Sequence, residues 1–302
     1  MNEPYIDPLV ETQPTPTVSW AASPPKKRRG LGCCLGLLAI PVFVALCLGG
    51  VLLLAGGRTN ILVLGLDARE PGSDLGRSDT MILSTFVPRE PYLGMLSIPR
   101  DLWVTIPGVG ENRINTAHFF AEAELPGSGP AAAMETVRQN FGVAVDYYVR
   151  VRFDGFLDLV DLLGGVEVEL PVAMSGYPAG AQHLNSEQAL AFVRDRAGSD
   201  DFFRMQRAQI FIKGLGKELM QPSAWPRLPQ ILPLVRQMID TNVPFAKWPA
   251  LAITVLRVGL DGMDSRTITR EMTNPFTTSE GAQVLGPNWA AINPVLLEMF
   301  GQ

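Results

Sequence analysis

The chain has 302 residues, 47% of them hydrophobic, and its 25 basic and 30 acidic side chains give a net charge of −5 at pH 7. This length suffices for one large domain or two small ones. The missing basic surplus argues against a general nucleic-acid binder, which carries an excess of Lys and Arg, so no nucleic-acid partner is expected.

The first 57 residues predict a cytoplasmic tail followed by a membrane anchor. Residues 1–30 are polar and rich in proline, which is typical of disorder, and they include the basic run Lys26–Arg29. Residues 31–57 carry no charge and exceed the roughly 20 apolar residues that cross a bilayer. A cleaved signal peptide is the alternative, but its apolar region is shorter, about 7–15 residues. The positive-inside rule places 1–30 in the cytoplasm and 58–302 outside the cell membrane.

All three cysteines, Cys33, Cys34 and Cys47, fall in the apolar segment. Residues 58–302 therefore offer no disulfide, zinc–thiolate site or thiol nucleophile. They include 21 basic and 27 acidic residues, a net charge of −6, so a bound anion requires arginines gathered at one place. No repeat or low-complexity linker interrupts this region, and one domain of about 240 residues is expected.

Hydrophobic periodicity and turn residues predict alternating strands and helices in this domain. Strands are expected at 60–66, 80–87, 92–98, 146–153 and 166–170, and helices at 130–141, 154–163, 185–196 and 202–219. Toward the C-terminus, helices are expected at 228–244, 248–260 and 288–300, with a strand at 266–272. The pattern favours an α/β fold, a three-layer α/β/α sandwich with a central mixed sheet covered on both faces.

Several catalytic motifs are missing from the sequence. It contains no G-x-x-x-x-G-K-[ST] loop, no G-x-S-x-G turn and no H-E-x-x-H pair. His118 and His183 stand apart from other candidate groups, and we interpret both as structural. The sequence therefore does not support acyl transfer by a serine nucleophile or hydrolysis by a zinc enzyme. Carboxylates and arginines remain as the candidate catalytic groups.

Arginine and aspartate occur together where three predicted strands begin or end. The pairs are Asp67 with Arg69, Arg77 with Asp79, and Arg100 with Asp101. Binding crevices of open α/β sheets form at strand ends, so the three pairs are expected to converge. A solvated turn explains any one pair, whereas three pairs so placed favour a common site.

A further cluster lies in residues 192–209, which contain no lysine and four arginines: Arg194, Arg196, Arg204 and Arg207. Arg204 and Arg207 are three apart and share a helix face, whereas Arg194 and Arg196 point the same way only in an extended chain. Exposed ion pairs on a solvated surface are the alternative. Planar guanidinium groups match phosphate oxygens two by two, which favours a phosphate-binding site.

Asp67 and Asp79 are the candidate ligands of a divalent cation. Mg²⁺ prefers one or two carboxylates together with waters and phosphate oxygens, and Mn²⁺ is the alternative ion. A metal and arginines without a protein nucleophile are typical of phosphoryl transfer, where positioning and charge stabilisation supply most of the catalysis. Asp67, Asp79 and Asp101 are the candidate general bases, and the sequence does not choose among them.

Six motifs, in this order, give the chain a specific resemblance to the LytR-CpsA-Psr family over about residues 60–217. They are NILVLGLDAR (60–69), GRSDTMIL (76–83), SIPRDLWVTIPGVGENRIN (97–115), VDLLGGVEVELP (160–171), HLNSEQALAFVRDR (183–196) and DFFRMQRAQ (201–209). The family consists of membrane-anchored enzymes of the bacterial envelope. The resemblance implies transfer of a glycopolymer, such as teichoic acid or capsule, from a polyprenyl-pyrophosphate carrier to peptidoglycan, with a phosphodiester as the product.

The resemblance also implies roles for individual residues. The catalytic residues would be Asp67, Asp79, Arg100 and Asp101, with Asp67 and Asp79 holding the metal and Asp201 orienting an arginine. The pyrophosphate would be bound by Arg69, Arg77, Arg100, Arg113, Arg194, Arg196, Arg204, Arg207 and Gln209. An apolar tunnel would take the lipid chain, and its candidate wall residues are Phe156, Leu159, Val160 and Leu163. Ordinary core packing is the alternative for each of these four.

The chain departs from the family pattern at two positions. Arg113 replaces the usual lysine and keeps its charge, whereas Ala208 stands where the family commonly has glutamine. The change at 208 removes one hydrogen bond to the pyrophosphate, worth about 0.5–1.5 kcal/mol, unless Gln209 supplies it. Two alternatives therefore remain beside the transferase: a Mg²⁺-dependent pyrophosphatase acting on the same lipid, and a non-catalytic, lipid-binding envelope regulator.

Overall fold

The computed structural model describes residues 50, 57–68, 74–153, 155–195 and 201–301, with the backbone alone for Asp67, Ala68 and Asp201. The predicted tail, 1–30, and nearly all of the predicted anchor, 31–57, lie outside the described residues. Within the described part of the chain, no helix is long and apolar enough to span a bilayer. Every element below belongs to one unit, Gly49–Gln302.

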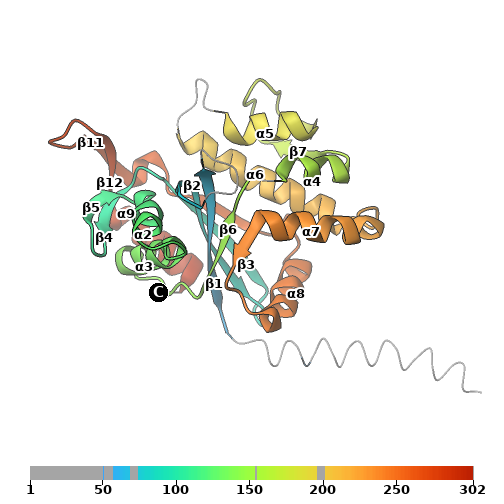
Figure 1. Ribbon diagram of the computed structural model, residues 1–302, viewed down its shortest axis with the longest axis horizontal. Coiled ribbons are helices and arrows are strands. Elements are labelled where there is room, and N and C mark those ends of the chain that lie inside the picture. Colours follow the sequence, from blue (N-terminus) through green and yellow to red (C-terminus); the bar gives the residue numbers. More distant parts are fainter. Residues whose placement is uncertain (1–49, 51–56, 69–73, 154, 196–200, 302) are drawn as a thin grey trace, which may run out of the picture. The chain divides into compact units, whose positions relative to one another are not determined.

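A mixed six-stranded sheet forms the centre of the fold (Figure 1), in the order β10-β3-β2-β1-β6-β9. Its strands are β1 (Thr59–Ala68), β2 (Gly76–Val87), β3 (Tyr92–Ile98), β6 (Tyr147–Val151), β9 (Ile239–Thr241) and β10 (Asp264–Thr267). The β1, β2 and β3 strands are antiparallel neighbours, while β6 runs parallel to β1 and β10 parallel to β3. The central strands are apolar on both faces, as a sheet covered on both sides requires.

One face of the sheet packs against α2 (Thr116–Glu124), α3 (Gly129–Phe141) and α9 (Trp289–Phe300). The largest core of the unit lies here and joins Leu64 and Leu96 of the sheet to Val137 of α3 and Met299 of α9, all fully or almost fully buried. Each fully buried aliphatic side chain contributes about 1.5–3 kcal/mol relative to an exposed one, so this layer is the main source of stability.

The opposite face of the sheet is covered by α6 (Asp201–Met220) and α8 (Trp248–Val258). A small core of Ile61, Val243 and Leu251 lies there. The amide of Gln209 on α6 donates to Ser97 Oγ on β3 at 2.9 Å and to the carbonyl of Arg266 on β10 at 2.8 Å. Helices thus lie on both faces, and the predicted mixed α/β fold with a central mixed sheet is confirmed.

A separate core lies among α4 (Phe156–Leu163), α5 (Ser186–Arg194), α7 (Leu228–Met238), the C-terminal half of α6 and the hairpin of β7 (Val166–Leu170) with β8 (Gly180–Leu184). We call this part of the unit the helical lobe. The strand β7 alternates buried and exposed residues, as VEVEL predicts. The predicted start of α5 is also confirmed, because Asn185 and Gln188 form a reciprocal capping box.

Two small hairpins, which the sequence did not predict, lie beside the sheet. They are β4 (Trp103–Ile106) with β5 (Gly110–Arg113), and β11 (Thr273–Thr277) with β12 (Gln283–Pro287). The helix predicted at 228–244 ends at Met238, and the strand predicted at 266–272 ends at Thr267 before a 3-10 turn at Arg270–Met272. Both differences follow from pairing, because 239–241 joins the sheet beside β6 and 264–267 beside β3.

Gly214 allows α6 to approach β7 closely. A Cβ at this position would lie 2.4 Å from the carbonyl oxygen of Glu167, which is backbone and cannot move aside. We expect Gly214→Ala to lower the free energy of unfolding by about 1–3 kcal/mol, although alanine favours helix. Denaturant unfolding would measure the loss, and Gly142→Ala, with open space around its Cβ but a left-handed φ of 69°, separates contact from backbone strain. An unchanged stability in Gly214→Ala would contradict the close approach.

Candidate functional site

Asp79 enters the site through an irregularity in the pairing of β1 and β2. Gly65 lies opposite Thr80 and Leu66 lies opposite Ser78, so the register shifts and Asp79 has no cross-strand partner on β1. Such bulges redirect a side chain and are common beside active sites. The bulge therefore explains why Asp79, near the start of a long buried strand, faces other polar groups.

The carboxylate of Asp79 receives donors from three other elements. Arg100, just after β3, contacts Asp79 Oδ2 with Nη1 at 3.1 Å, and Arg204 of α6 approaches the same oxygen at 3.5 Å. Arg204 Nη2 also donates to the carbonyl oxygen of Asp79 at 2.7 Å. The other carboxylate oxygen accepts from Asn115 Nδ2 at 3.4 Å. Since the Arg204 side chain is only 9% exposed, these charges interact with little screening by water.

Asp101 connects this group to the two hairpins. Its carboxylate lies 3.4 Å from Arg100 Nε and 3.1 Å from Arg113 Nε, and its carbonyl accepts from the backbone of Leu285 on β12 at 3.0 Å. Arg113 of β5 donates in turn to the carbonyl of Gln283 at 2.8 Å. We call Asp79, Arg100, Asp101, Arg113 and Arg204 the arginine–aspartate cluster. Its three guanidinium groups outnumber its two carboxylates, so the cluster is net positive and suits an anion.

The side-chain oxygen of Asn115 indicates whether the residues beside Asp79 could hold a metal ion. Its Oδ1 atom is buried and has no hydrogen-bond partner among the described residues, while its Nδ2 bonds Asp79. An unsatisfied buried oxygen beside a carboxylate is a donor set for a hard cation, which also takes water and phosphate oxygens. Within the described residues, no group of three or more His, Cys, Asp or Glu side chains could hold a metal. Asp79 and Asn115 therefore fit a cation whose further ligands are water and the phosphate oxygens of a bound substrate.

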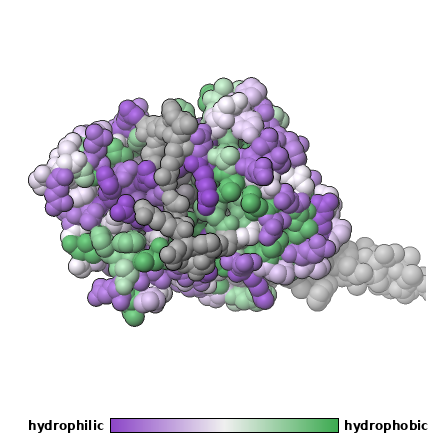
Figure 2. All heavy atoms as spheres, turned by 45° about the horizontal axis from the view of Figure 1, so that its top comes forward, coloured by the Kyte–Doolittle hydropathy of each residue, from purple (hydrophilic) through white to green (hydrophobic). Residues whose placement is uncertain are grey.

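One hollow borders the cluster, and a second adjoins the first. The first, of about 610 Å³, is bounded by Asp101 and Arg113 of the cluster and by Phe202, Arg270 and Phe276. The second, of about 570 Å³, shares Phe202 and Arg270 and extends to other polar residues, among them Gln206, Thr269 and Glu271. We call them the hairpin pocket and the side pocket. In Figure 2, which turns the top of Figure 1 forward by 45°, hydrophilic side chains lie on both sides of the centre and an apolar area is exposed to the right of it.

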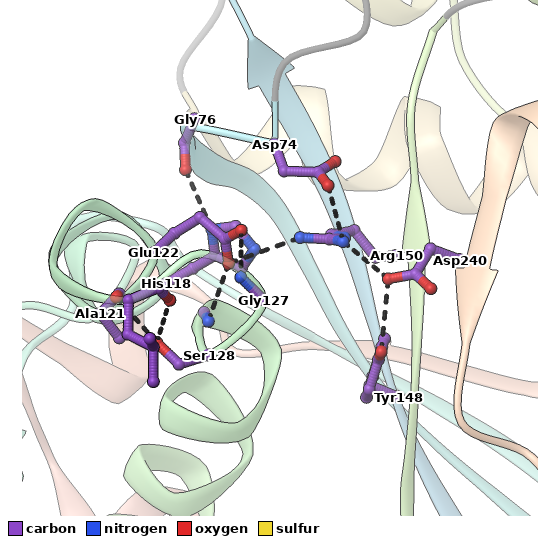
Figure 3. Close-up of polar contacts among 12 residues, drawn as sticks. Asp74, Gly76, His118, Ala121, Glu122, Gly127, Ser128, Tyr148, Arg150 and Asp240 are labelled. Atoms are coloured by element: carbon purple, nitrogen blue, oxygen red, sulfur yellow. Dashed lines mark hydrogen bonds and ion pairs between the residues drawn. The ribbon is translucent and has the colours of Figure 1, made fainter.

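A buried arginine network stabilises the sheet near the start of β2 (Figure 3). Arg150 of β6, 5% exposed, lies 3.0 Å from Asp74 Oδ2, 2.7 Å from Asp240 Oδ2 and 3.6 Å from Glu122 Oε2. Asp74 also pairs with Arg152 at 3.0 Å. Since Asp74 directly precedes the strand that carries Asp79, the network anchors the chain where it enters the site.

The same network joins α2 to α3. The carboxylate of Glu122 accepts from the backbone of Gly127 at 2.7 Å and of Gly129 at 2.9 Å, so it satisfies free N–H groups at the start of α3. Beside it, His118 is fully buried and its Nδ1 lies 3.2 Å from the carbonyl of Gly76. That contact requires a proton on Nδ1, because the carbonyl only accepts. His118 is therefore structural, in agreement with its interpretation from the sequence.

Acidification is expected to weaken the fold through His118. Burial, together with the charge of Arg150, lowers the pKa of His118 below its ordinary value. Because the unfolded chain then binds the proton more readily, the free energy of unfolding falls as the pH drops below about 6.5, by at most about 1.4 kcal/mol per unit. Urea titrations at pH 7 and pH 5 should show a smaller decrease for His118→Gln than for the wild type. The exposed His183 provides the control His183→Gln, and equal decreases in wild type and His118→Gln would contradict the assignment.

Comparison with known proteins identifies the family. The model of the LytR-CpsA-Psr family matches residues 52–294. This chain belongs to the LytR-CpsA-Psr family. A "polyisoprenyl-teichoic acid–peptidoglycan teichoic acid transferase TagU" of Oceanobacillus iheyensis is 36% identical over 198 residues, 64% of this chain and 61% of that protein. The TagU of Enterococcus faecalis is 31% identical over 202 residues, covering 64% of both chains. The chain thus spans less than two thirds of these relatives.

Solved structures support the same fold. The crystal structure of B. subtilis TagV has a TM-score of 0.64 and 26% identity, covering 81% of this chain and 98% of that chain. The crystal structure of B. subtilis TagU has a TM-score of 0.60 at 26% identity, covering 82% and 98%. The solved structures thus share the fold of about four fifths of this chain, and the family model extends beyond the residues of the sequence resemblance, to residue 294.

Within this LytR-CpsA-Psr unit, the predicted residues Asp79, Arg100, Asp101, Arg113 and Arg204 are brought together. Asn115 was absent from the predicted set, although the motif of residues 97–115 ends on it and could have identified it. Arg77 lies opposite Asp67 in the β1–β2 register and is exposed. Arg69 and Arg196 lie outside the described residues, as do the side chains of Asp67 and Asp201.

Three other predicted phosphate ligands make different contacts. The guanidinium of Arg194 lies 4.7 Å from the ring centre of Phe153, a cation–π contact at the end of α5. Arg207 is 1% exposed and donates to the carbonyl of Asp195, so it links α6 to the end of α5. Burial, with the nearby charge of Arg204, lowers the pKa of Arg207. Gln209 bonds Ser97 and the backbone of Arg266, so its amide does not replace the one missing at Ala208.

The predicted lipid-wall residues belong to the core of the helical lobe. Phe156, Leu159 and Val160 are at most 5% exposed, and Leu163 packs against them partly buried. The rings of Phe156 and Phe211 lie 5.3 Å apart. These contacts are those of a packed core, and a role in lipid binding stays a prediction.

Proposed function

We propose that this LytR-CpsA-Psr protein is a phosphotransferase that moves a glycopolymer from a polyprenyl-pyrophosphate carrier to peptidoglycan. The observation that carries the proposal is the arginine–aspartate cluster, in which Arg100, Arg113 and Arg204 surround the carboxylates of Asp79 and Asp101. Guanidinium groups bind phosphate oxygens with two hydrogen bonds each, and hydrogen bonds to charged groups contribute about 1.5–3 kcal/mol. The TagU relatives, named as teichoic acid transferases, support the same reaction class.

The reaction exchanges the phosphoanhydride bond of the pyrophosphate for a phosphate ester bond. An acceptor hydroxyl oxygen bonds to the phosphorus that carries the glycan, and the bond from that phosphorus to the bridging oxygen breaks. Polyprenyl phosphate leaves with the electron pair, and the hydroxyl proton passes to a carboxylate, for which Asp79 and Asp101 are the described candidates. Arg100 and Arg204 stabilise the charge that develops on the phosphate oxygens, as arginines do in other phosphoryl transfers.

A magnesium ion completes the proposed site. Asp79 Oδ1 and Asn115 Oδ1 would hold it, with Asp67 as the further ligand predicted from the sequence. When bound, Mg²⁺ neutralises pyrophosphate charge and polarises its oxygens. Arg204 and Arg100 pair with the Asp79 carboxylate and orient it in either case.

The protein is further proposed to act at the outer face of the cell membrane, with residues 31–57 as a single-pass anchor and 1–30 in the cytoplasm. The apolar length and the basic run before it support this orientation. Protease added to intact cells should remove residues 58–302 and leave the tail protected, whereas full protection would contradict the orientation.

Mass spectrometry of a transfer reaction tests the function. The full-length protein in detergent would be mixed with a short-chain polyprenyl-pyrophosphate oligosaccharide and a peptidoglycan oligomer, with and without Mg²⁺. A Mg²⁺-dependent sugar-phosphate adduct on the peptidoglycan is the expected result. Free sugar phosphate without an adduct would favour the pyrophosphatase, and unchanged lipid that stays bound would favour the non-catalytic binder.

A further inference from the structure

The hairpin pocket opens directly from the cluster and has the chemistry of a carbohydrate site. Its volume of about 610 Å³ lies within the roughly 300–1,000 Å³ range of small-molecule sites. Phe202 and Phe276 offer aromatic surface, while Arg270, Thr277 and Gln283 offer polar groups. Sugar rings present C–H faces that pack on aromatic rings and hydroxyl or acetamido edges that need hydrogen bonds, so this mixture suits them.

The aromatic side chains of the pocket are held in place although they face solvent. Phe276 of β11 is 43% exposed, and its ring meets Trp103 of β4 edge-on, with the centroids 6.2 Å apart. The guanidinium of Arg270 lies 5.9 Å from the ring centre of Phe202. Exposed rings fixed by neighbours lose little side-chain entropy on binding, which is typical of a binding surface.

The cluster lies between an apolar region, the helical lobe, and a polar region, the hairpin pocket. The α6 helix carries Arg204 in its first turn and Phe211 and Leu215 in the core of the helical lobe, so one end touches the cluster and the other the apolar lobe. The lobe also exposes Leu157, Ile212 and Leu232. The hairpin pocket is bounded by Phe202 at the start of α6 and by β11 and β12, and Figure 1 shows these two strands on the other side of the sheet from α4 and α7. An apolar part of a ligand can therefore contact the helical lobe, and a polar part can enter the hairpin pocket.

In phosphoryl transfer the attacking and leaving oxygens lie roughly in line across the phosphorus. The polyprenyl phosphate is the leaving group, and its apolar chain is best accommodated in the helical lobe. The attacking hydroxyl therefore approaches from the opposite side, where Asp101 and Arg113 open into the hairpin pocket.

We propose that the hairpin pocket binds the acceptor glycan strand of peptidoglycan, an alternating chain of N-acetylated amino sugars with carboxylate groups, and that the side pocket extends this groove. The inference rests on the proposed function, whose acceptor it locates. Phe276 packs against a sugar ring, and Arg270, shared by both pockets, pairs with an acceptor carboxylate. The acceptor hydroxyl then reaches the cluster beside Asp101.

Kinetics with both substrates varied separately tests the location. The variants are Phe276→Ala, which removes the aromatic surface, and Thr277→Arg, which fills the pocket from an exposed position. Each is expected to raise KM for a peptidoglycan oligomer at least tenfold while KM for the polyprenyl-pyrophosphate donor stays within twofold. Phe245→Ala, at an 87% exposed position outside both pockets, is the matched control and should behave as the wild type.

Binding without turnover separates this inference from the proposed function. Calorimetry with the full-length protein and a tetrasaccharide of alternating N-acetylglucosamine and N-acetylmuramic acid should show Kd at least tenfold weaker for both variants. This holds whether or not transfer is detected, so a failed transfer assay with intact tetrasaccharide binding would overturn the function alone. An unchanged Kd for the tetrasaccharide in both variants would overturn the proposal that the pocket binds the acceptor. A raised KM for the donor with an unchanged KM for the acceptor would assign the pocket to the donor glycan instead.

Discussion

Arg204→Ala is expected to lower kcat/KM for glycopolymer transfer by about 10²–10³-fold or more, since that is the usual loss when one preorganised donor to a charged transition state is removed. Arg204 is 7% exposed and holds both the carboxylate and the carbonyl of Asp79. The substitution therefore removes positive charge and one of the two guanidinium groups that contact the carboxylate, while Arg100 remains. Arg204→Lys keeps the charge but not the two-point contact, so its activity should lie between those of the wild type and the alanine variant.

Two further variants show whether the loss of activity in Arg204→Ala arises from its contact with Asp79. Asp79→Asn keeps the size of the side chain but removes the charge that Arg100 and Arg204 share, and should reduce kcat as strongly as Arg204→Ala. Because the two residues act together, the double variant should be little worse than either single one. Arg138→Ala, at an exposed arginine of α3 paired with Glu135, is the matched control. A loss below threefold in Arg204→Ala, measured as adduct formed per unit time, would show that the cluster does not bind the reacting phosphate.

Arg150→Met should lower the free energy of unfolding by about 3–5 kcal/mol, because it leaves the buried carboxylate of Glu122 without its cation. Glu122 is as buried as Arg150 itself, with 5% of each side chain exposed, and Asp74 and Asp240 are about 30% exposed. A melting curve should show Tm lower by about 10 °C in a unit of this size. Arg138→Met, on the surface of α3, should change Tm by less than about 1 °C.

A compensating variant separates lost charge pairing from lost packing. Glu122→Gln removes one uncompensated charge and keeps an oxygen that accepts from Gly127 or Gly129. The double variant Arg150→Met with Glu122→Gln should therefore be more stable than Arg150→Met alone, by about 0.5–3 kcal/mol of coupling. If the double variant were less stable by the sum of both single effects, the network would act through packing and not through charge.

Much of the fold could be predicted from local sequence. The runs at 60–66 and 92–98 are apolar enough to be buried on both faces, and they form β1 and β3. The helix α5 (Ser186–Arg194) carries its own cap, and Gly164 ends α4 in the left-handed conformation. The elements that were missed depend on distant partners, because β9 exists only through pairing with β6 and β11 only through pairing with β12.

The sequence by itself predicted the chemistry that we propose: arginine near aspartate at strand ends, no nucleophile motif and an uncharged apolar segment before the domain. Residue type and order decide these, since charge and hydrophobicity are properties of single side chains. Only the tertiary structure shows which of the described arginines lie in the arginine–aspartate cluster. Arg204 reaches Asp79 through a β-bulge, whereas Arg194 stacks on Phe153 and Arg207 holds the end of α5. Residues equally charged in sequence differ because burial and the position of neighbouring elements, which arise only on folding, set the partners of each guanidinium group.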